Sequence, residues 1–324
     1  MTTMALDEQE IAGFRVVHAQ VADAIETAVL GKREVVDLVL VALFAGGHVL
    51  LEDVPGTGKT TLARAVASAL GGQSRRVQFT PDLLPSDVTG TSVYDPRTGE
   101  VRFRPGPVFA NVVLADEINR AAAKTQSALL EVMEERTVTV DGVPHPVGEP
   151  FLVVATQNPI DLDGTYRLPE AQLDRFMLRT SIGYPAQQHE LDVLRPGSGA
   201  GRVTDVPTVT SPEAVAHYGR LLSTLHVAEP ILEYISAIGA ATRASDQLRL
   251  GASTRGLRAL VRCVQVYAAA QGRHFVVPGD VQTLASPVLA HRLVLSREAV
   301  LSGTTSSEVL AAAVESVPVP RPVP

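Results

Sequence analysis

The sequence has a single cysteine, Cys263, so no disulfide can form within the chain. Such cysteine usage is typical of a protein from a reducing compartment. The amino terminus places Asp7, Glu8 and Glu10 where a secretory signal needs positive charge. The longest uncharged apolar run, residues 38–51, is too short to span a bilayer. These absences predict a cytoplasmic protein that is not inserted in a membrane.

Positive charge is also scarce relative to negative charge. The chain has 28 Lys and Arg against 35 Asp and Glu, a formal net charge of −7, so its bulk electrostatics do not favour a nucleic acid partner. The 8 histidines are scattered and form no metal-ligand or Ser-His-Asp pattern. With 45% hydrophobic and 19% charged residues, the composition is that of a globular protein, and 324 residues suit two domains.

Short apolar runs alternate with helical patterns over residues 31–190, after an amphipathic helix and linker within residues 1–30. Continuous apolar runs are typical of buried parallel strands, and their alternation with helices predicts an α/β fold. The runs are residues 48–51, 76–79, 112–115, 151–155 and 177–182.

Two segments interrupt this alternation, and the pattern changes beyond the last run. Residues 93–103 contain a DPRTG turn and residues 137–147 an Asp-Gly pair, which predict β-hairpins that protrude from the core. Residues 191–312 are helix-patterned and predict a second, helical domain. The proline-alternating residues 313–324 predict a disordered tail.

The most informative motif is DVPGTGKTT, residues 53–61. A glycine-rich turn between an apolar run and a helical pattern cradles phosphates with its backbone N–H groups. Lys59 is expected to reach the β- and γ-phosphates of a nucleoside triphosphate, and the Thr60 hydroxyl to bind Mg²⁺. The usual motif has glycine at the position of Asp53, so the match is incomplete.

Polar residues follow the next two buried runs. Asp116 and Glu117 come directly after residues 112–115; in phosphoryl-transfer ATPases the first such acid holds Mg²⁺ and the second polarises the attacking water. The alternative is a strand that ends in solvated acids. Asn158 is expected to hydrogen-bond the γ-phosphate and the water, and the alternative is a turn-forming residue before Pro159.

Two arginines are candidates for stabilising the charge on a transferring phosphoryl group. Arg175 lies at a predicted helix end, and Arg255 begins a helix of the second domain. Either residue can instead be a surface salt-bridge partner. The sequence leaves open which arginine acts within its own subunit.

In this order, the motifs resemble the MoxR family of AAA+ ATPases over roughly residues 15–295. The stretches that carry the resemblance are HVLLEDVPGTGKTTLARA, QFTPDLLPSDVTG, LADEINRAAAKTQSALLEVMEERTVTVDG, VVATQNPID, LPEAQLDRFMLR, GASTRGL and VVPGDVQTLASPVLAHR. The resemblance implies an AAA+ P-loop NTPase core with a five-stranded parallel sheet and inserted hairpins, followed by an all-helical lid. Asp at position 53 is ordinary for this family.

The resemblance implies a catalytic role for five residues. Lys59 corresponds to the Walker A lysine, Glu117 to the second Walker B acid and Asn158 to sensor 1. Arg175 corresponds to an arginine finger that acts on the site of a neighbouring subunit, and Arg255 to sensor 2 in the lid.

The resemblance also implies ATP and Mg²⁺ as cofactors, bound at the interface of adjacent subunits in a ring, usually a hexamer. Thr60 and Asp116 are the expected metal-binding residues, and residues 29–32 resemble the adenine-side linker. The expected nucleotide-binding residues are Val29, Gly31, Lys32, Val54, Pro55, Gly56, Thr57, Gly58, Lys59, Thr60, Thr61 and Arg255.

Proteins of this family act as chaperone-like remodellers and commonly pair with a protein that carries a von Willebrand A domain. The resemblance implies the same role and the same kind of partner here, and it leaves the client protein unknown. One alternative is a nucleic-acid motor or transcription activator, because related AAA+ clades with similar inserts act on DNA. Arg97, Arg102 and Arg104 on the first predicted hairpin keep this alternative open. A second is a magnesium-chelatase-type subunit, which QFTPDLLPSDVTG disfavours. A third is a non-hydrolysing scaffold, which the intact Asp116 and Glu117 disfavour.

Overall fold

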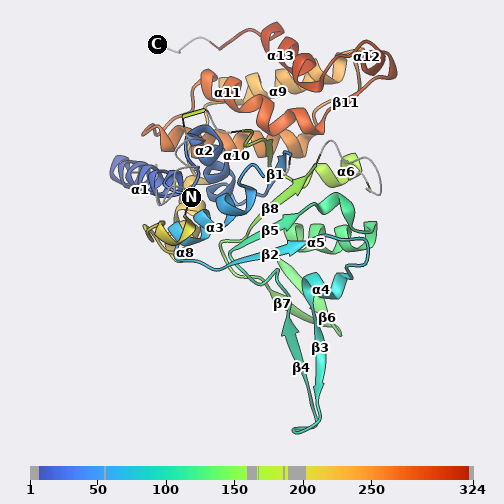
Figure 1. Ribbon diagram of the computed structural model, residues 1–324. Helices are drawn as coiled ribbons and strands as arrows, with labels where there is room; N and C mark the ends of the chain where they lie inside the picture. Colours follow the sequence, from blue (N-terminus) through green and yellow to red (C-terminus); the bar gives the residue numbers. More distant parts are fainter. Residues whose placement is uncertain are drawn as a thin grey trace. The chain divides into compact units, whose positions relative to one another are not determined.

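The computed structural model describes residues 7–54, 56–158, 166, 168–184, 187–188 and 202–320. They divide into two compact units (Figure 1). The core unit comprises the described residues of 20–168 and 180–216, and the helical unit those of 1–19, 169–179 and 217–324. Helix α1 (Glu8–Glu26) and helix α8 (Pro212–Leu222) each contribute to both units.

A five-stranded sheet with the order β2-β5-β8-β1-β9 organises the core unit, and its last strand, β9, includes residues assigned to both units (Figure 1). Its strands are β1 (Val49–Glu52), β2 (Ser74–Gln78), β5 (Val112–Asp116), β8 (Leu152–Gln157) and β9 (Leu178–Thr180). The pairs β1–β8, β8–β5 and β5–β2 are parallel. All five predicted runs form strands, and β5 is buried at every position, as expected for a strand covered on both faces.

Helices follow the strands of this sheet. The core unit contains α2 (Arg33–Phe44), α3 (Lys59–Ala69), α4 (Pro85–Thr89), η1 (Ile118–Arg120), α5 (Ala123–Glu135) and η2 (Val203–Asp205). Helix α3 packs against β5 and β2 because Leu62, Ala63 and Val66 form its apolar face and are fully buried or nearly so. This packing holds the start of α3 at the edge of the sheet where the strands end.

Both predicted hairpins are confirmed. Strands β3 (Gly90–Asp95) and β4 (Glu100–Pro105) pair antiparallel, as do β6 (Thr137–Val140) and β7 (Val143–Pro146). The β3–β4 hairpin extends away from the sheet (Figure 1). Phe103 of β4 stacks on His145 of β7, with 3.9 Å between ring centroids and 16° between ring planes. The two hairpins therefore contact each other within the core unit.

The helical unit confirms the predicted helical lid, but the lid is not all-helical because it contains a two-stranded sheet, β10–β11. Its elements are α6 (Glu170–Leu173), α9 (Glu229–Ala244), β10 (Leu248–Leu250), α10 (Thr254–Ala270), α11 (Pro278–Leu289), η3 (Ala290–Arg292), β11 (Val294–Leu295), α12 (Arg297–Leu301) and α13 (Ser306–Ser316). Helices α9, α10, α11 and α13 pack on one another. None of the helices in the described part of the chain has the length and apolar character needed to cross a membrane.

The end of α13 differs from the predicted tail. Residues 313–316 were assigned to the disordered segment, but they continue α13 to Ser316. A capping box between Thr305 and Glu308 starts this helix, and Ala313 is buried against its neighbours. The proline alternation that ends the helix begins only at Val317.

Residues 169–179, which were predicted within the core, belong to the helical unit because buried side chains of that unit bind them. Arg292 is 5% exposed; it donates to the Phe176 carbonyl over 2.6 Å and pairs with Asp174 at 3.3 Å. Burial lowers the pKa of His291 to about 3, so its ring is neutral, and its Nε2 atom lies 3.1 Å from the same carbonyl oxygen. Cys263 is buried in the same unit, which raises the pKa of its thiol to about 12.

Candidate functional site

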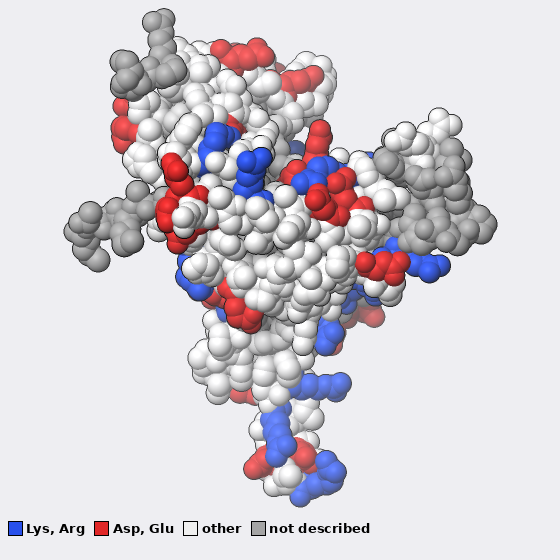
Figure 2. Space-filling model, turned by 90° about the vertical axis from the view of Figure 1, so that its left-hand side faces the viewer, with Lys and Arg blue, Asp and Glu red and all other residues white. Residues whose placement is uncertain are grey.

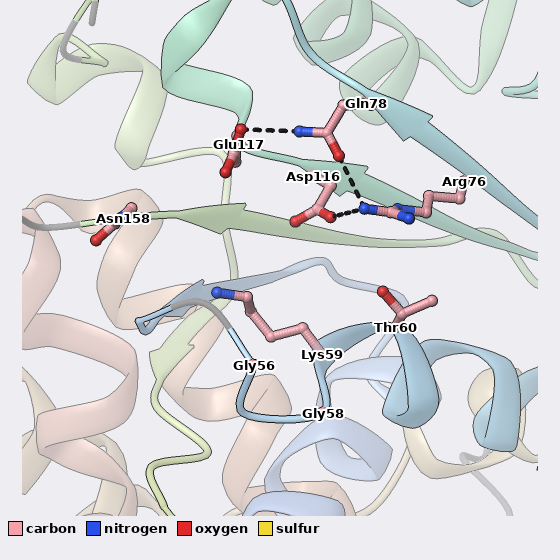
Figure 3. A pocket seen from close by; sticks show the side chains of 9 residues that line it. All are labelled: Gly56, Gly58, Lys59, Thr60, Arg76, Gln78, Asp116, Glu117 and Asn158. Atoms are coloured by element: carbon pink, nitrogen blue, oxygen red, sulfur yellow. Dashed lines mark hydrogen bonds and ion pairs between the residues drawn. The ribbon is translucent and has the colours of Figure 1, made fainter. Parts of the chain in front are cut away.

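A pocket of about 400 Å³ in the core unit gathers the polar residues that follow β1, β5 and β8 (Figure 3). The carboxyl ends of parallel strands meet at one edge of a sheet, where ligands of open α/β sheets bind. The structure thus brings together residues from the phosphate-loop, acid and amide motifs. The pocket is lined by Gly56, Gly58, Lys59, Thr60, Arg76, Gln78, Asp116, Glu117 and Asn158.

Glycine conformations shape the loop. Gly56 (φ 86°) and Gly58 (φ 91°) adopt left-handed backbone conformations that side chains disfavour. Gly58 is the N-cap residue of α3, so the unpaired N–H groups and positive end of that helix point toward the loop. Thr61 lies half-buried in the first turn of α3, and Pro55 lies outside the described residues.

The loop closes on itself through side chains. Lys59 Nζ donates to the carbonyls of Asp53 at 2.9 Å and Val54 at 3.0 Å, and Thr57 Oγ1 donates to Val54 O at 3.3 Å. The Lys59 ammonium group lies across the loop, below Asp116 and Glu117 in the view of Figure 3. An ammonium held beside exposed backbone N–H groups is suited to a polyphosphate.

A buried threonine sets the orientation of both acids. The Thr156 hydroxyl donates to Asp116 Oδ1 at 2.6 Å and accepts the Glu117 N–H at 2.9 Å. Thr156 is fully buried, and Glu117 takes a left-handed backbone conformation (φ 56°). Thr156 is a candidate functional residue that the motifs did not predict, although a polar residue in a mostly apolar strand was a signal for it.

We expect Thr156→Val to lower ATP turnover by about 10-fold and to reduce the free energy of unfolding by about 1–3 kcal/mol, because Asp116 and the Glu117 N–H lose a buried partner. Steady-state phosphate release and urea denaturation measure the two effects. Thr156→Ser keeps the hydroxyl and should retain most of both quantities. Thr139→Val, at an exposed position of β6, is the matched control. Full turnover in Thr156→Val contradicts the orienting role.

Edge strand β2 supplies two pocket residues that the sequence analysis missed. Arg76 donates to Asp116 Oδ2 at 2.6 Å and to Gln78 Oε1 at 2.8 Å, while Gln78 Nε2 donates to Glu117 Oε2 at 2.8 Å (Figure 3). Residues two apart on a strand share a face, so both side chains reach the acids. The available signal was that these two polar residues alternate with Val77 and Phe79 in the predicted run 76–79.

The pocket fits a hard divalent cation. The Thr60 hydroxyl and the Asp116 carboxylate lie in the same cavity, and oxygen ligands of this kind suit Mg²⁺. Asp116 is 8% exposed, so its charge requires a compensating cation. In this structure the Arg76 guanidinium supplies that compensation.

The remaining predicted residues lie outside this pocket. In the core unit, Val29 is buried, Gly31 has φ 67°, and Lys32 Nζ donates to Tyr184 O at 2.7 Å. The two arginines belong to the helical unit: Arg175 follows α6 and is half-buried, and Arg255 is exposed in the first turn of α10.

Comparisons with known proteins show two family matches. Residues 48–178 match the ATPase family associated with various cellular activities (AAA), and residues 240–313 match the AAA lid domain.

The chain is 47% identical to the uncharacterised protein YeaC of Bacillus subtilis over 91% of this chain and 92% of the relative. It is 39% identical to chaperone MoxR1 of Mycobacterium tuberculosis over 92% and 81%, and 33% identical to protein MoxR of Paracoccus denitrificans over 94% and 97%. A solved structure from Cytophaga hutchinsonii superposes with a TM-score of 0.90 at 36% identity, covering 97% of this chain and 98% of that one.

Proposed function

The chain belongs to the MoxR family of AAA ATPases, and from its site we propose that it hydrolyses ATP at the subunit interfaces of a ring, usually a hexamer, and so remodels a protein partner. The observation that carries this proposal is the single pocket that joins the phosphate loop to Asp116, Glu117 and Asn158. A surface turn or a strand with solvated acids would not bring these groups together.

Each pocket residue has a distinct task in the proposed reaction. The backbone of residues 56–61 and the Lys59 ammonium bind the β- and γ-phosphates. Thr60 and Asp116 hold Mg²⁺, which when bound offsets the charge of the phosphates. Glu117 accepts a proton from the attacking water, and Asn158 orients that water against the γ-phosphate.

Two arginines of the helical unit complete the proposed site. We assign Arg175 to the site of a neighbouring subunit and Arg255 to the site of its own subunit, where their guanidinium groups stabilise the transferring phosphoryl. A site shared in this way links hydrolysis to the arrangement of the subunits, which can then move a bound partner.

The partner is proposed to be a protein. One relative is described as a chaperone. Kinship with MoxR proteins favours a partner protein with a von Willebrand A domain that takes part in remodelling an unknown client. A cytoplasmic location is part of the proposal. The buried Cys263, which has a raised thiol pKa and hence low reactivity, is compatible with a reducing compartment.

Two of the three hairpin arginines that kept the nucleic-acid alternative open are paired with carboxylates. At the end of the β3–β4 hairpin, Arg102 pairs with Glu100 at 2.7 Å and Arg97 with Asp95 at 3.6 Å. Figure 2 shows charges of both signs at this tip. Arginines that already pair with carboxylates contribute less to a phosphate-binding surface, because such a surface needs uncompensated positive charge.

The test of the proposal is ATP hydrolysis as a function of protein concentration. If the neighbouring subunit completes the site, the rate per subunit should rise steeply with concentration and level off when rings form, and it should require Mg²⁺. Phosphate release and light scattering on the same samples measure both quantities. A rate per subunit that is constant while the particle mass changes contradicts a shared site.

A further inference from the structure

Asp53 departs from the usual phosphate-loop pattern, and its side chain has an unexpected position. The carboxylate is buried, with the residue 6% exposed. Its Oδ2 atom accepts the N–H of Ile182 at 2.5 Å and the N–H of Gly183 at 3.0 Å. These donors lie about 130 residues away along the chain, just after β9. One side chain thus fixes the loop to the segment that follows the last strand.

The segment held by Asp53 also contacts the predicted adenine-side linker. Lys32 Nζ donates to the Tyr184 carbonyl at 2.7 Å. Gly183 has φ 65°, a conformation that side chains disfavour. Ile182 is 4% exposed and Val29 6%. Hydrogen bonds therefore join the segments 29–32, 53–54 and 182–184 within the core unit.

Asp53 contacts the phosphate loop with its main chain and residues 182–183 with its side chain. Its carbonyl accepts the Lys59 ammonium at 2.9 Å, and its N–H donates to Gln157 O at 3.2 Å. A glycine at this position would keep both main-chain contacts. It would leave the N–H groups of Ile182 and Gly183 without their carboxylate, so only the connection to residues 182–184 would be lost.

We propose that Asp53 is a positioning residue that fixes Ile182–Tyr184 as a second wall of the adenosine end of the ATP site, beside Val29–Lys32. This inference rests on the proposed function, because it requires a nucleotide to bind at the loop. Asp53, a residue of the phosphate loop, would then contribute to the affinity for the nucleoside and not to the affinity for the phosphates. The loop without Asp53 should still bind phosphates.

The experiment compares ADP with inorganic pyrophosphate, which carries the same number of phosphates without the nucleoside. Calorimetric titration of the full chain with Mg²⁺ gives both affinities. We expect Asp53→Gly to weaken ADP binding by about 10-fold, the effect of losing a hydrogen bond to a charged group, and to change pyrophosphate binding by less than about 2-fold. Asp53→Asn retains an acceptor oxygen and should stay within about 3-fold of the wild type for ADP.

Asp141→Gly is the matched control, because Asp141 is an exposed turn residue with φ 51° and glycine suits that conformation. It should leave both affinities unchanged. Lys32→Met removes the bond to Tyr184 while leaving Asp53 intact, so it gives the same selective loss for ADP even if Asp53→Gly does not fold.

An equal loss for ADP and pyrophosphate in Asp53→Gly would show that Asp53 shapes the phosphate loop itself and would overturn the inference. Unchanged ADP binding in Asp53→Gly would overturn it as well, and so would unchanged ADP binding in Lys32→Met if Asp53→Gly does not fold. Either result leaves the proposed function intact. Wild-type protein that binds neither ligand would instead contradict the proposed function, and with it the basis of this inference.

Discussion

Glu117→Gln is expected to lower ATP turnover by about 10²–10⁴-fold, the range associated with removing a general base. Glutamine keeps the size of the side chain and an oxygen that can accept from Gln78 and Arg120, which now donate to Glu117 at 2.8 Å and 3.0 Å. It cannot take a proton from water. The variant should therefore fold and bind ATP as the wild type does, and fail only in the chemical step.

Single-turnover hydrolysis and equilibrium ATP binding, measured on the same preparation, separate these two effects. Glu131→Gln, at an exposed position of α5, is the control and should keep wild-type turnover. Retained hydrolysis in Glu117→Gln would show that the assigned mechanism is wrong. Because the variant stays in its ATP state, it also suits co-purification, which would identify the client and any von Willebrand A domain partner.

The fold was predictable because its signals are local. The five predicted runs form the five strands of the sheet. The turn residues within 93–103 and within 137–147 indicated the two hairpins. A buried parallel strand is mostly apolar, and a tight turn needs residues that tolerate its backbone angles. Both requirements can be read within a few residues.

The polar contacts of the site were less predictable because they connect different strands. Thr156 and Asp116 are separated by 40 residues, as are Arg76 and Asp116. Each contact depends on the register of neighbouring parallel strands, such as Val77 opposite Ala115, and local periodicity does not give that register. The motifs therefore predicted residues that the structure brings into one candidate pocket, whereas the residues that orient the acids emerged only from the structure.

Asp53 shows the same limit in another form. The sequence marked it as a departure from the phosphate-loop pattern, and family resemblance made the departure ordinary. Neither gave a physical reason for a carboxylate there. The reason lies in two backbone N–H groups beyond β9, donors that every residue except proline carries and that leave no trace in the sequence.

Mixing two inactive variants should restore ATP turnover if Arg175 acts on a neighbouring subunit. Arg175→Ala keeps Glu117 and lacks the arginine, while Glu117→Gln keeps the arginine and lacks the base. In rings assembled at random from equal amounts, about a quarter of the interfaces combine an intact Glu117 with an intact Arg175 from the next subunit. Since an arginine finger contributes about 10³–10⁵-fold in rate, turnover should rise from near zero to about a quarter of the wild-type value.

Arg255 gives the opposite expectation, which makes the experiment a comparison of the two arginines. If Arg255 serves its own subunit, every subunit in a mixture of Arg255→Ala and Glu117→Gln carries one defect in its own site, and turnover stays near zero. A mixture of Arg175→Ala with the Arg175→Ala, Glu117→Gln double variant contains no intact Arg175 and fixes the background. Phosphate release after subunit exchange measures all three mixtures. Recovery with Arg255→Ala and none with Arg175→Ala would reverse the two assignments, and no recovery in either would place both arginines in the site of their own subunit.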